Sequence, residues 1–216
     1  LFKKNKIIHL KGKASIVDKS TVTVTDNLKN KTNYKAKNIV ISTGSIPTSL
    51  PGIKIDEKIV VSSTGALSFD KVPKELIVIG GGYIGLELSS VWKRLGSKVT
   101  VIEFLDHIIP GMDKDISTEF YKILNKQGIN FKLDSKVTSV NVLKNKAVVD
   151  FTNNKSNKRE RIECDKVLVA VGRRSNIGED LLKTGIKLDS NKKIKVNEKF
   201  ETSIKNIYAI GDVINK

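Results

Sequence analysis

Residues 78–87 read VIGGGYIGLE, in which three consecutive glycines and a fourth glycine follow apolar residues. The preceding Leu76–Ile79 is a short apolar run, which is typical of a parallel strand buried on both faces. After the glycines, apolar residues recur at helical spacing up to Gly96, which is placed to end a helix; they are Ile84, Leu88, Val91, Trp92 and Leu95. The stretch therefore predicts a buried strand, a tight turn and an amphipathic helix.

The glycine spacing matches the GxGxxG pattern of dinucleotide-binding loops. In such a loop, Gly80 makes the tight turn, Gly82 lets a diphosphate approach the backbone, and Gly85 lets the helix pack closely on the strand. The helix N-terminus adds N–H groups and a partial positive charge that favour a phosphate. The pattern alone is weak, but here it follows a strand and opens a helix, as the motif requires. A glycine-rich turn that binds no ligand is the alternative.

An acidic residue, Glu103, ends the next predicted strand, Lys98–Glu103, roughly 20 residues after the glycines, where the motif expects one. Its carboxylate would accept hydrogen bonds from the adenosine-ribose hydroxyls. A 2′-phosphate would be repelled by on the order of 4 kcal/mol per pair of unit charges at about 4 Å and an effective dielectric of about 20. No arginine follows in EFLDHIIPG (residues 103–111) to neutralise the carboxylate. We therefore expect NAD(H) to be preferred over NADP(H).

The rest of the chain predicts an α/β protein. A second amphipathic helix is expected between Asp113, a suitable N-cap, and Gly128, a suitable stop. Its apolar face consists of Ile116, Phe120, Ile123 and Leu124. The polar run TNNKSNKRER (152–161) is interpreted as an exposed hairpin tip. Strands are predicted at Ile39–Ile41, 130–133, 136–143, 147–151 and 167–171, and in the last apolar run, NIYAIGDV, at 206–213.

The charge of the chain raises the question of a nucleic acid or an anionic membrane as partner, since its 216 residues carry a formal net charge of +16. Most of this charge is lysine, without a long basic block or interleaved aromatics, whereas nucleic-acid grooves favour clustered arginine and aromatic residues. We therefore expect a solvated basic surface and no nucleic-acid partner. No apolar run approaches the roughly 20 residues that span a bilayer, so no membrane partner is expected either.

Cysteine and histidine usage predicts neither a disulfide framework nor a metal site. Cys164 is the only cysteine, and we expect it to be a buried thiol in a reducing compartment. His9 and His107 are interpreted as surface or loop residues, because no metal-ligand spacing includes them. The N-terminal stretch lacks an initiator Met and an apolar signal region, and is interpreted as mid-chain sequence.

Two further apolar runs end in glycine motifs that a single dinucleotide domain does not need: IVISTGSIP (39–47) and NIYAIGDV (206–213). Between them lie VVSSTGALSFDKVPKELIVIGGGYIGLELSSVWKRLGSKVTVIEFLDHIIP (60–110), KQGINFKLDSKVTSV (126–140) and VLVAVGRR (167–174). In this order the chain resembles the pyridine nucleotide–disulfide oxidoreductase family of flavoproteins, and within it the dihydrolipoyl dehydrogenases of the mitochondrial type. The resemblance implies a Rossmann-like FAD/NAD(P)-binding fold, with a parallel sheet, helices and an antiparallel β-meander. It assigns residues 1–71 to part of the FAD-binding domain, 72–190 to the NAD-binding domain and 191–216 to the return segment of the FAD-binding domain.

The resemblance also implies roles for single residues on the NAD side. Val137 would pack beside the adenine, Gly172 would border the nicotinamide end, and Glu87 would lie near the nicotinamide carboxamide. Tyr83 matches a tyrosine that covers the flavin in some relatives; an ordinary exposed aromatic is the alternative. The implied NAD-binding residues are Gly80, Gly81, Gly82, Tyr83, Ile84, Gly85, Leu86, Glu87, Glu103, Val137 and Gly172.

On the FAD side, the resemblance implies contacts from a glycine near the adenine, a turn beside the cofactor and an aspartate at the ribityl chain. These are Gly12, Thr43, Gly44, Ser45 and Asp212. The family's redox cysteine pair, its first glycine loop for the FAD diphosphate and its catalytic His–Glu pair are not in this sequence. We therefore expect no catalytic residue and no metal site here, and interpret the chain as a central part of a longer enzyme that alone neither turns over nor retains FAD.

For the whole enzyme, the resemblance implies oxidation of dihydrolipoamide by NAD⁺ through a cysteine pair and FAD. Its partners would be the lipoyl domains of 2-oxo-acid dehydrogenase complexes, and it would be a homodimer in the mitochondrial matrix or a plastid. Two alternatives are another flavin-dependent disulfide reductase or NADH oxidase, and a stand-alone nucleotide-binding module without catalysis.

Overall fold

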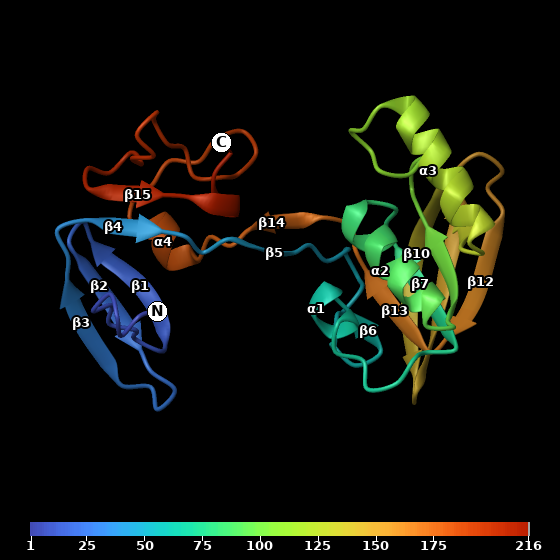
Figure 1. Ribbon diagram of the computed structural model, residues 1–216, viewed down its shortest axis with the longest axis horizontal. Helices are drawn as coiled ribbons and strands as arrows, with labels where there is room; N and C mark the ends of the chain where they lie inside the picture. The colour runs from blue at the N-terminus through green and yellow to red at the C-terminus, as the bar shows by residue number, and fades with distance from the viewer. Residues whose placement is uncertain (216) are drawn as a thin grey trace. The chain divides into compact units, whose positions relative to one another are not determined.

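The computed structural model describes residues 1–215, which form two compact units (Figure 1). One unit consists of residues 1–46 and the chain from Arg174 onward, and the other consists of residues 47–173. The chain passes between the units at 46–47 and 173–174, whereas the resemblance places the domain limits at 71–72 and 190–191. Strands β5 (Ser45–Pro47) and β14 (Arg173–Ser175) form a two-stranded sheet.

The 47–173 unit is built on a five-stranded parallel sheet in the order β6-β13-β7-β8-β9. Its strands are β6 (Val60–Val61), β7 (Glu75–Ile79), β8 (Lys98–Ile102), β9 (Asn130–Lys132) and β13 (Lys166–Val169). Its helices are α1 (Ser63–Ala66), α2 (Tyr83–Arg94) and α3 (Lys114–Lys126). An antiparallel meander completes the unit, with β10 (Ser135–Leu143), β11 (Lys146–Asn153) and β12 (Arg159–Cys164). The expected α/β fold with a parallel sheet and a meander is confirmed.

The two faces of the parallel sheet are covered by different elements. Along β7, Leu76 and Val78 join one apolar cluster with residues of the helices, such as Leu86 and Trp92. The alternate residues of β7 join a second cluster with meander residues, including Phe151. Because side chains alternate across a strand, a strand covered on both faces must be apolar throughout. This explains the continuous apolar run that precedes the glycines.

Residues 47–71 belong to this unit because their apolar side chains complete its core. The strand β6 pairs in parallel with β13, where Val60 lies opposite Val167. Ile53 is buried in the same cluster as the meander residues. The prolines of this segment suggest a mere connector, but the pairing of residues about a hundred positions apart is not visible in a local pattern.

The other unit carries a separate core. Its elements are the antiparallel sheet β1 (Lys13–Asp18), β2 (Thr21–Thr25) and β3 (Lys31–Lys35), the parallel pair β4 (Ile39–Ile41) and β15 (Ile207–Ala209), the helix α4 (Glu179–Lys183) and the 3-10 helix η1 (Gly211–Val213). Leu181 and Ile186 are buried in one cluster with Ile39 and Ile207. Residues 174–190 are therefore part of this unit and not of the nucleotide unit.

The two predicted helices are present with the expected ends. The backbone N–H of Asp115 donates to the Asp113 carboxylate at 2.9 Å, so Asp113 is the N-cap of α3. The exposed tip of the β11–β12 hairpin is shorter than the polar run suggests, because its last residues, from Arg159 onward, already form β12.

Candidate nucleotide-binding site

The turn between β7 and α2 explains three of the glycines by geometry. Gly80 has a φ of +107°, in the left-handed region, and a Cβ there would lie 2.5 Å from the Ala170 carbonyl oxygen. A Cβ on Gly85 would lie 2.3 Å from the Gly80 carbonyl oxygen, so only glycine lets the helix approach the strand this closely. A Cβ on Gly82, the N-cap of α2, would meet no protein atom within 4 Å. No side chain caps this helix start, which leaves its backbone accessible to a ligand.

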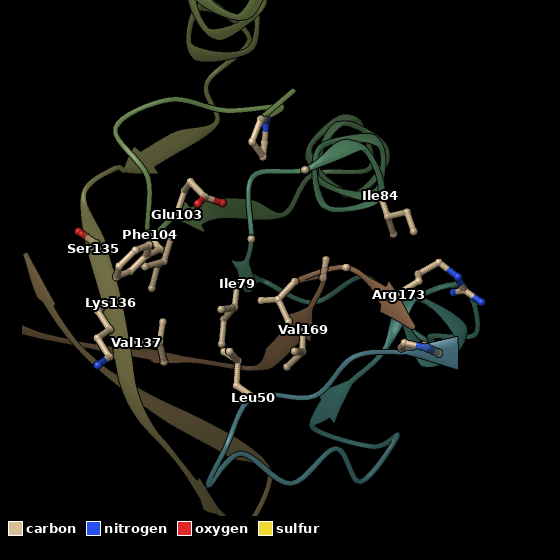
Figure 2. Close-up of a pocket in the computed structure, with 18 of the residues that line it drawn as sticks. Leu50, Ile79, Ile84, Glu103, Phe104, Ser135, Lys136, Val137, Val169 and Arg173 are labelled. Carbon is tan, nitrogen blue, oxygen red and sulfur yellow. The ribbon is translucent and has the colours of Figure 1, made fainter. Parts of the chain in front are cut away.

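A cavity of about 940 Å³ opens beside this turn (Figure 2). It lies at the carboxyl edge of the parallel sheet, where β7, β8 and β13 end at Ile79, Ile102 and Val169. Open parallel sheets bind ligands at this edge. Its wall is mostly apolar, with Leu50 and Val137 among the labelled side chains, and charged groups come from Glu103, Lys136 and Arg173.

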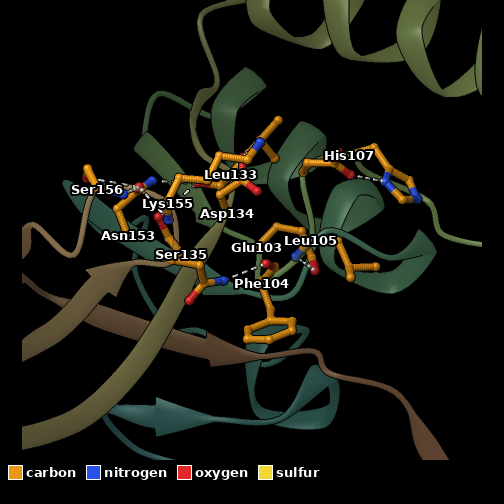
Figure 3. A network of polar contacts seen from close by, with 12 residues as sticks. Glu103, Phe104, Leu105, His107, Leu133, Asp134, Ser135, Asn153, Lys155 and Ser156 are labelled. Carbon is orange, nitrogen blue, oxygen red and sulfur yellow. Dashed lines mark hydrogen bonds and ion pairs between the residues drawn. The ribbon is translucent and has the colours of Figure 1, made fainter.

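Glu103 is buried at the start of the loop after β8, with 8% of its surface exposed. Its Oε2 accepts a hydrogen bond from the Gly81 backbone N–H at 2.5 Å, and its Oε1 accepts one from the Leu105 N–H at 2.9 Å (Figure 3 shows the Leu105 side of this arrangement). Within residues 1–215 no ion pair includes Glu103. The carboxylate is therefore held by two backbone N–H groups at the wall of the cavity.

The structure brings most of the predicted NAD-side residues to this one cavity. Those that line it are Gly80, Gly82, Tyr83, Ile84, Glu103, Val137 and Gly172. Four others do not line it. Gly81 lies against the Glu103 side chain. Gly85 and Leu86 are buried where α2 packs on the sheet. Glu87 is exposed, one helical turn beyond Tyr83. Their roles at a nucleotide stay predictions.

Several cavity residues were not singled out from the sequence. Phe104 follows the end of β8 and Arg173 follows the end of β13, and the rule that ligands bind at strand carboxyl ends could have identified both. Lys136 and Ser135 come from the start of β10. Leu50 and Ser63 line the cavity through tertiary packing alone, for which the sequence carries no local signal.

The predicted FAD-side residues lie in the other unit, and four of the five are close together. Strands β4 and β15 pair in parallel, so the segments that follow them leave at the same edge. The Ser45 hydroxyl donates to Asp212 Oδ2 at 2.7 Å. The Thr43 hydroxyl donates to the Asn176 carbonyl at 2.7 Å, and the Gly44 carbonyl accepts from the Asn176 N–H at 2.9 Å. Asp212 and Thr43 are exposed, so an arriving polar group could reach them.

The fifth, Gly12, lies just before β1 in the antiparallel sheet. A Cβ there would lie 2.4 Å from the Thr25 carbonyl oxygen, so the close approach of two strands accounts for the glycine. Its role at an adenine stays a prediction.

The cysteine and the histidines lie outside these sites. Cys164 is buried at the end of β12, and burial raises the pKa of its thiol to about 12. His107 Nδ1 lies 2.6 Å from Asp106 Oδ1 in an exposed pair, and this hydrogen bond lowers the pKa of the Asp106 carboxyl. Among the described residues, no group of three or more His, Cys, Asp or Glu side chains is arranged to hold a metal ion. In the same part of the chain, no helix is long and apolar enough to cross a membrane.

The parallel sheet, the glycine turn and the acidic residue at the end of the second strand define a dinucleotide-binding α/β protein. The sequence pattern of the pyridine nucleotide-disulphide oxidoreductases matches residues 2–216, and the chain belongs to this family. The members of this family are FAD- and NAD-dependent flavoproteins.

Individual relatives refine this placement. A dihydrolipoamide dehydrogenase of Chaetomium thermophilum is 49% identical over 214 residues, which cover 98% of this chain and 42% of that protein. The mitochondrial dihydrolipoyl dehydrogenase of Bos taurus is 49% identical over 219 residues, covering 99% of this chain and 43% of its own. A leghemoglobin reductase of Glycine max is 46% identical over 215 residues, covering 99% and 41%. The chain thus spans less than half the length of these relatives.

A solved structure agrees with the fold. The HOCl-induced flavoprotein disulfide reductase RclA of Escherichia coli, determined as a Cu(II) complex, superposes with a TM-score of 0.85 at 28% identity. The match covers 99% of this chain and 47% of that one.

Proposed function

We propose that residues 47–173 bind NAD(H) as the nucleotide-binding part of a FAD-dependent disulfide reductase of the dihydrolipoyl dehydrogenase type. The observation that carries this proposal is the position of Glu103. Its buried carboxylate stands between the glycine turn and the cavity and is fixed by the N–H groups of Gly81 and Leu105. A carboxylate fixed at the end of the second strand is suited to accept hydrogen bonds from two ribose hydroxyls.

The glycine turn fits a diphosphate. The open space at Gly82 lets a phosphate approach the backbone, and the uncapped N-terminus of α2 offers N–H groups and a partial positive charge. Arg173, on the cavity wall, adds a cationic side chain at the edge nearest to Ile84 in Figure 2. These groups would bind the diphosphate of either NAD(H) or NADP(H), so they supply affinity but not selectivity.

Selectivity would come from Glu103. A 2′-phosphate placed where the ribose hydroxyls bind would meet this carboxylate at a cost on the order of 4 kcal/mol at an effective dielectric of about 20. Lys136 lines the same cavity and offsets part of this repulsion, but it is exposed and its charge is screened by water. The fixed, buried acid therefore decides the preference for NAD(H).

The nicotinamide would lie toward the end of β13, where Val171 and Gly172 line the cavity. When bound, NAD exchanges a hydride at its nicotinamide ring, and the residues of this chain orient the ring and exclude water from it. Asp212 and Ser45 in the other unit would hold part of the FAD. For the whole protein we propose oxidation of dihydrolipoamide by NAD⁺ in 2-oxo-acid dehydrogenase complexes, as a homodimer in mitochondria, in line with the names of its relatives.

The experiment is a calorimetric titration of the 216-residue chain with NADH and with NADPH. We expect the wild type to bind NADH at least tenfold more tightly. The variant Glu103→Gln should narrow this ratio, because the charge that repels the 2′-phosphate is gone while the side chain keeps its size. Asp106→Asn is the matched control, since it removes an acid from the same loop that does not line the cavity and should leave the ratio unchanged. Equal affinity of the wild type for both nucleotides would contradict the proposal.

A further inference from the structure

The segment Glu103–Leu105 is held by two turns, the one between β9 and β10 and the tip of the β11–β12 hairpin (Figure 3 shows residues of both). The Ser135 N–H donates to the Glu103 carbonyl at 2.8 Å, and the Asp134 N–H donates to the Leu105 carbonyl at 2.9 Å. Glu103 and Phe104 both line the cavity, so the position of this backbone sets the position of two cavity side chains.

The middle carbonyl of the segment is held by a side chain from a distant turn. Asn154 Nδ2 donates to the Phe104 carbonyl oxygen at 3.0 Å, across 50 residues of sequence. A carbonyl oxygen can only accept, so the carboxamide must present its NH₂ group here and its orientation is determined. The Asn154 backbone N–H also donates to the Asp134 carbonyl at 2.6 Å, which ties the hairpin tip to the β9–β10 turn.

Hydrogen bonds within the hairpin tip and from the tip to the β9–β10 turn fix the position of Asn154. The Asn153 Oδ1 accepts hydrogen bonds from the N–H groups of Lys155 and Ser156 at 3.1 and 2.9 Å, which closes the tip locally. Lys155 Nζ pairs with Asp134 Oδ2 at 2.8 Å and joins the tip to the same turn a second time. A tip serving only as a solvated connection would need none of the bonds that cross to the other turn.

We propose that Asn154 is a positioning residue for the nucleotide site, acting through the Phe104 carbonyl on Glu103. This inference rests on the proposed function. The Glu103 carboxylate is anchored on the Leu105 N–H, two residues along the same backbone, so a shift of this segment moves the carboxylate relative to Gly81 and the cavity. Asn154 is exposed, and water can satisfy the Phe104 carbonyl when the side chain is removed. Its loss should therefore affect orientation at the site more than folding.

The test compares NADH and NADPH affinities and the thermal midpoint for the wild type and three variants. Asn154→Ala should lower NADH affinity about fivefold, as for the loss of one neutral hydrogen bond, and change NADPH affinity less. Asn154→Asp should lower NADH affinity at least as much, because a carboxylate cannot donate to a carbonyl. Ser156→Ala removes a hydroxyl that bonds only within the tip and should match the wild type. The thermal midpoints should agree among all four proteins.

The double variant Asn154→Ala with Glu103→Gln separates positioning from a general loss of structure. If Asn154 acts through Glu103, removing it in the Glu103→Gln background should change NADH affinity less than twofold. Suppose that the wild type prefers NADH but Asn154→Ala leaves the ratio of NADH to NADPH affinity unchanged. That result overturns the role of Asn154 and leaves the proposed function standing. A wild type without NADH binding overturns the proposed function and the inference with it.

Discussion

At the residue scale, two glycines of the turn meet different requirements. Gly85 allows the helix to pack closely on the strand, and Gly82 leaves space for a ligand. Gly85→Ala should destabilise the fold by about 1–3 kcal/mol, because the new methyl group would overlap the Gly80 carbonyl oxygen. Gly82→Ala should cost about 1 kcal/mol or less: alanine is a poorer N-cap residue than glycine, but it can adopt the extended backbone found here and no protein atom lies near the methyl group. It should nevertheless lower NADH affinity at least tenfold.

Thermal unfolding measures the stability of the two variants, and NADH titration measures their affinity for the nucleotide. Each variant is the control for the other, because one should lose stability and the other should lose binding. A Gly82→Ala variant that binds NADH like the wild type would place the diphosphate elsewhere.

Cys164 provides a prediction about pH. Burial raises the pKa of its thiol in the folded state to about 12, above the ordinary value of about 9. Between these two values the unfolded chain loses a proton that the folded chain keeps, so the free energy of unfolding should fall as the pH rises from about 9 to about 12. Below about pH 9 the thiol is protonated in both states, so the stability that depends on it is fully present. Denaturant titrations of the wild type and Cys164→Ala across this range measure it, and identical pH slopes would contradict it.

The tight turn at Gly80 and the close packing at Gly85 could be predicted because each depends on local spacing. The hydrogen bond that the Glu103 carboxylate accepts from the Gly81 N–H could not be predicted in this way. This bond joins the loop after β8 to the loop after β7, and it depends on where a backbone group points in three dimensions. The bond from Asn154 to Phe104 is hidden in the same way, within a polar run that reads as an ordinary hairpin tip.

At the scale of the element, α3 forms over the predicted residues, but only half of its predicted apolar face packs: Leu124 is buried in the core and Phe120 packs against it. Ile116 and Ile123 are 51% and 52% exposed, whereas Ser117, which was not predicted on this face, is buried. The Ser117 hydroxyl donates to the Ile108 carbonyl at 2.7 Å, which lets a polar residue replace an apolar one on this face. A hydrophobic period predicts that a helix exists, but it does not settle which of its apolar residues pack against the core.

Two neighbouring residues of α3 make this difference in burial testable. Leu124→Ala should lower the free energy of unfolding by about 2–4 kcal/mol, because it opens a cavity in the core between α3 and the sheet. Ile123→Ala is the matched control on the same helix and should cost much less, since half of the side chain is already exposed. Chemical denaturation measures both. Equal losses would mean that Ile123 packs in the core to the same extent as Leu124.

At the scale of the whole molecule, the class of fold was predictable and the limits of its units were not. The succession of strand, turn and helix that begins at Leu76, and the strands that follow it, could be predicted from local sequence patterns. The segment 47–71 joins the nucleotide unit through Val60 and Ile53, and 174–190 joins the other unit through Leu181. These memberships depend on contacts between distant parts of the chain, which spacing within a short window does not encode.

The division into units leads to a prediction that uses the single tryptophan of the chain. Trp92 lies on α2 in the 47–173 unit, 8% exposed, with its ring centroid 5.0 Å from that of Phe69. Its fluorescence therefore reports the unfolding of this unit, whereas far-ultraviolet circular dichroism reports both. NAD⁺ at about 100 times its dissociation constant should stabilise the unit by about 2.7 kcal/mol and raise the fluorescence midpoint by roughly 8 °C.

The Gly82→Ala variant is the control, because its tryptophan environment is intact while the diphosphate site is obstructed, so the same NAD⁺ concentration should raise its midpoint by no more than about half as much. If the two units unfold separately, the dichroism should show a second transition that NAD⁺ leaves in place, since the proposed nucleotide contacts all lie between residues 47 and 173. A fluorescence midpoint that saturating NAD⁺ does not move in the wild type would contradict nucleotide binding by this unit. A shift of the second transition alone would place the nucleotide in the other unit.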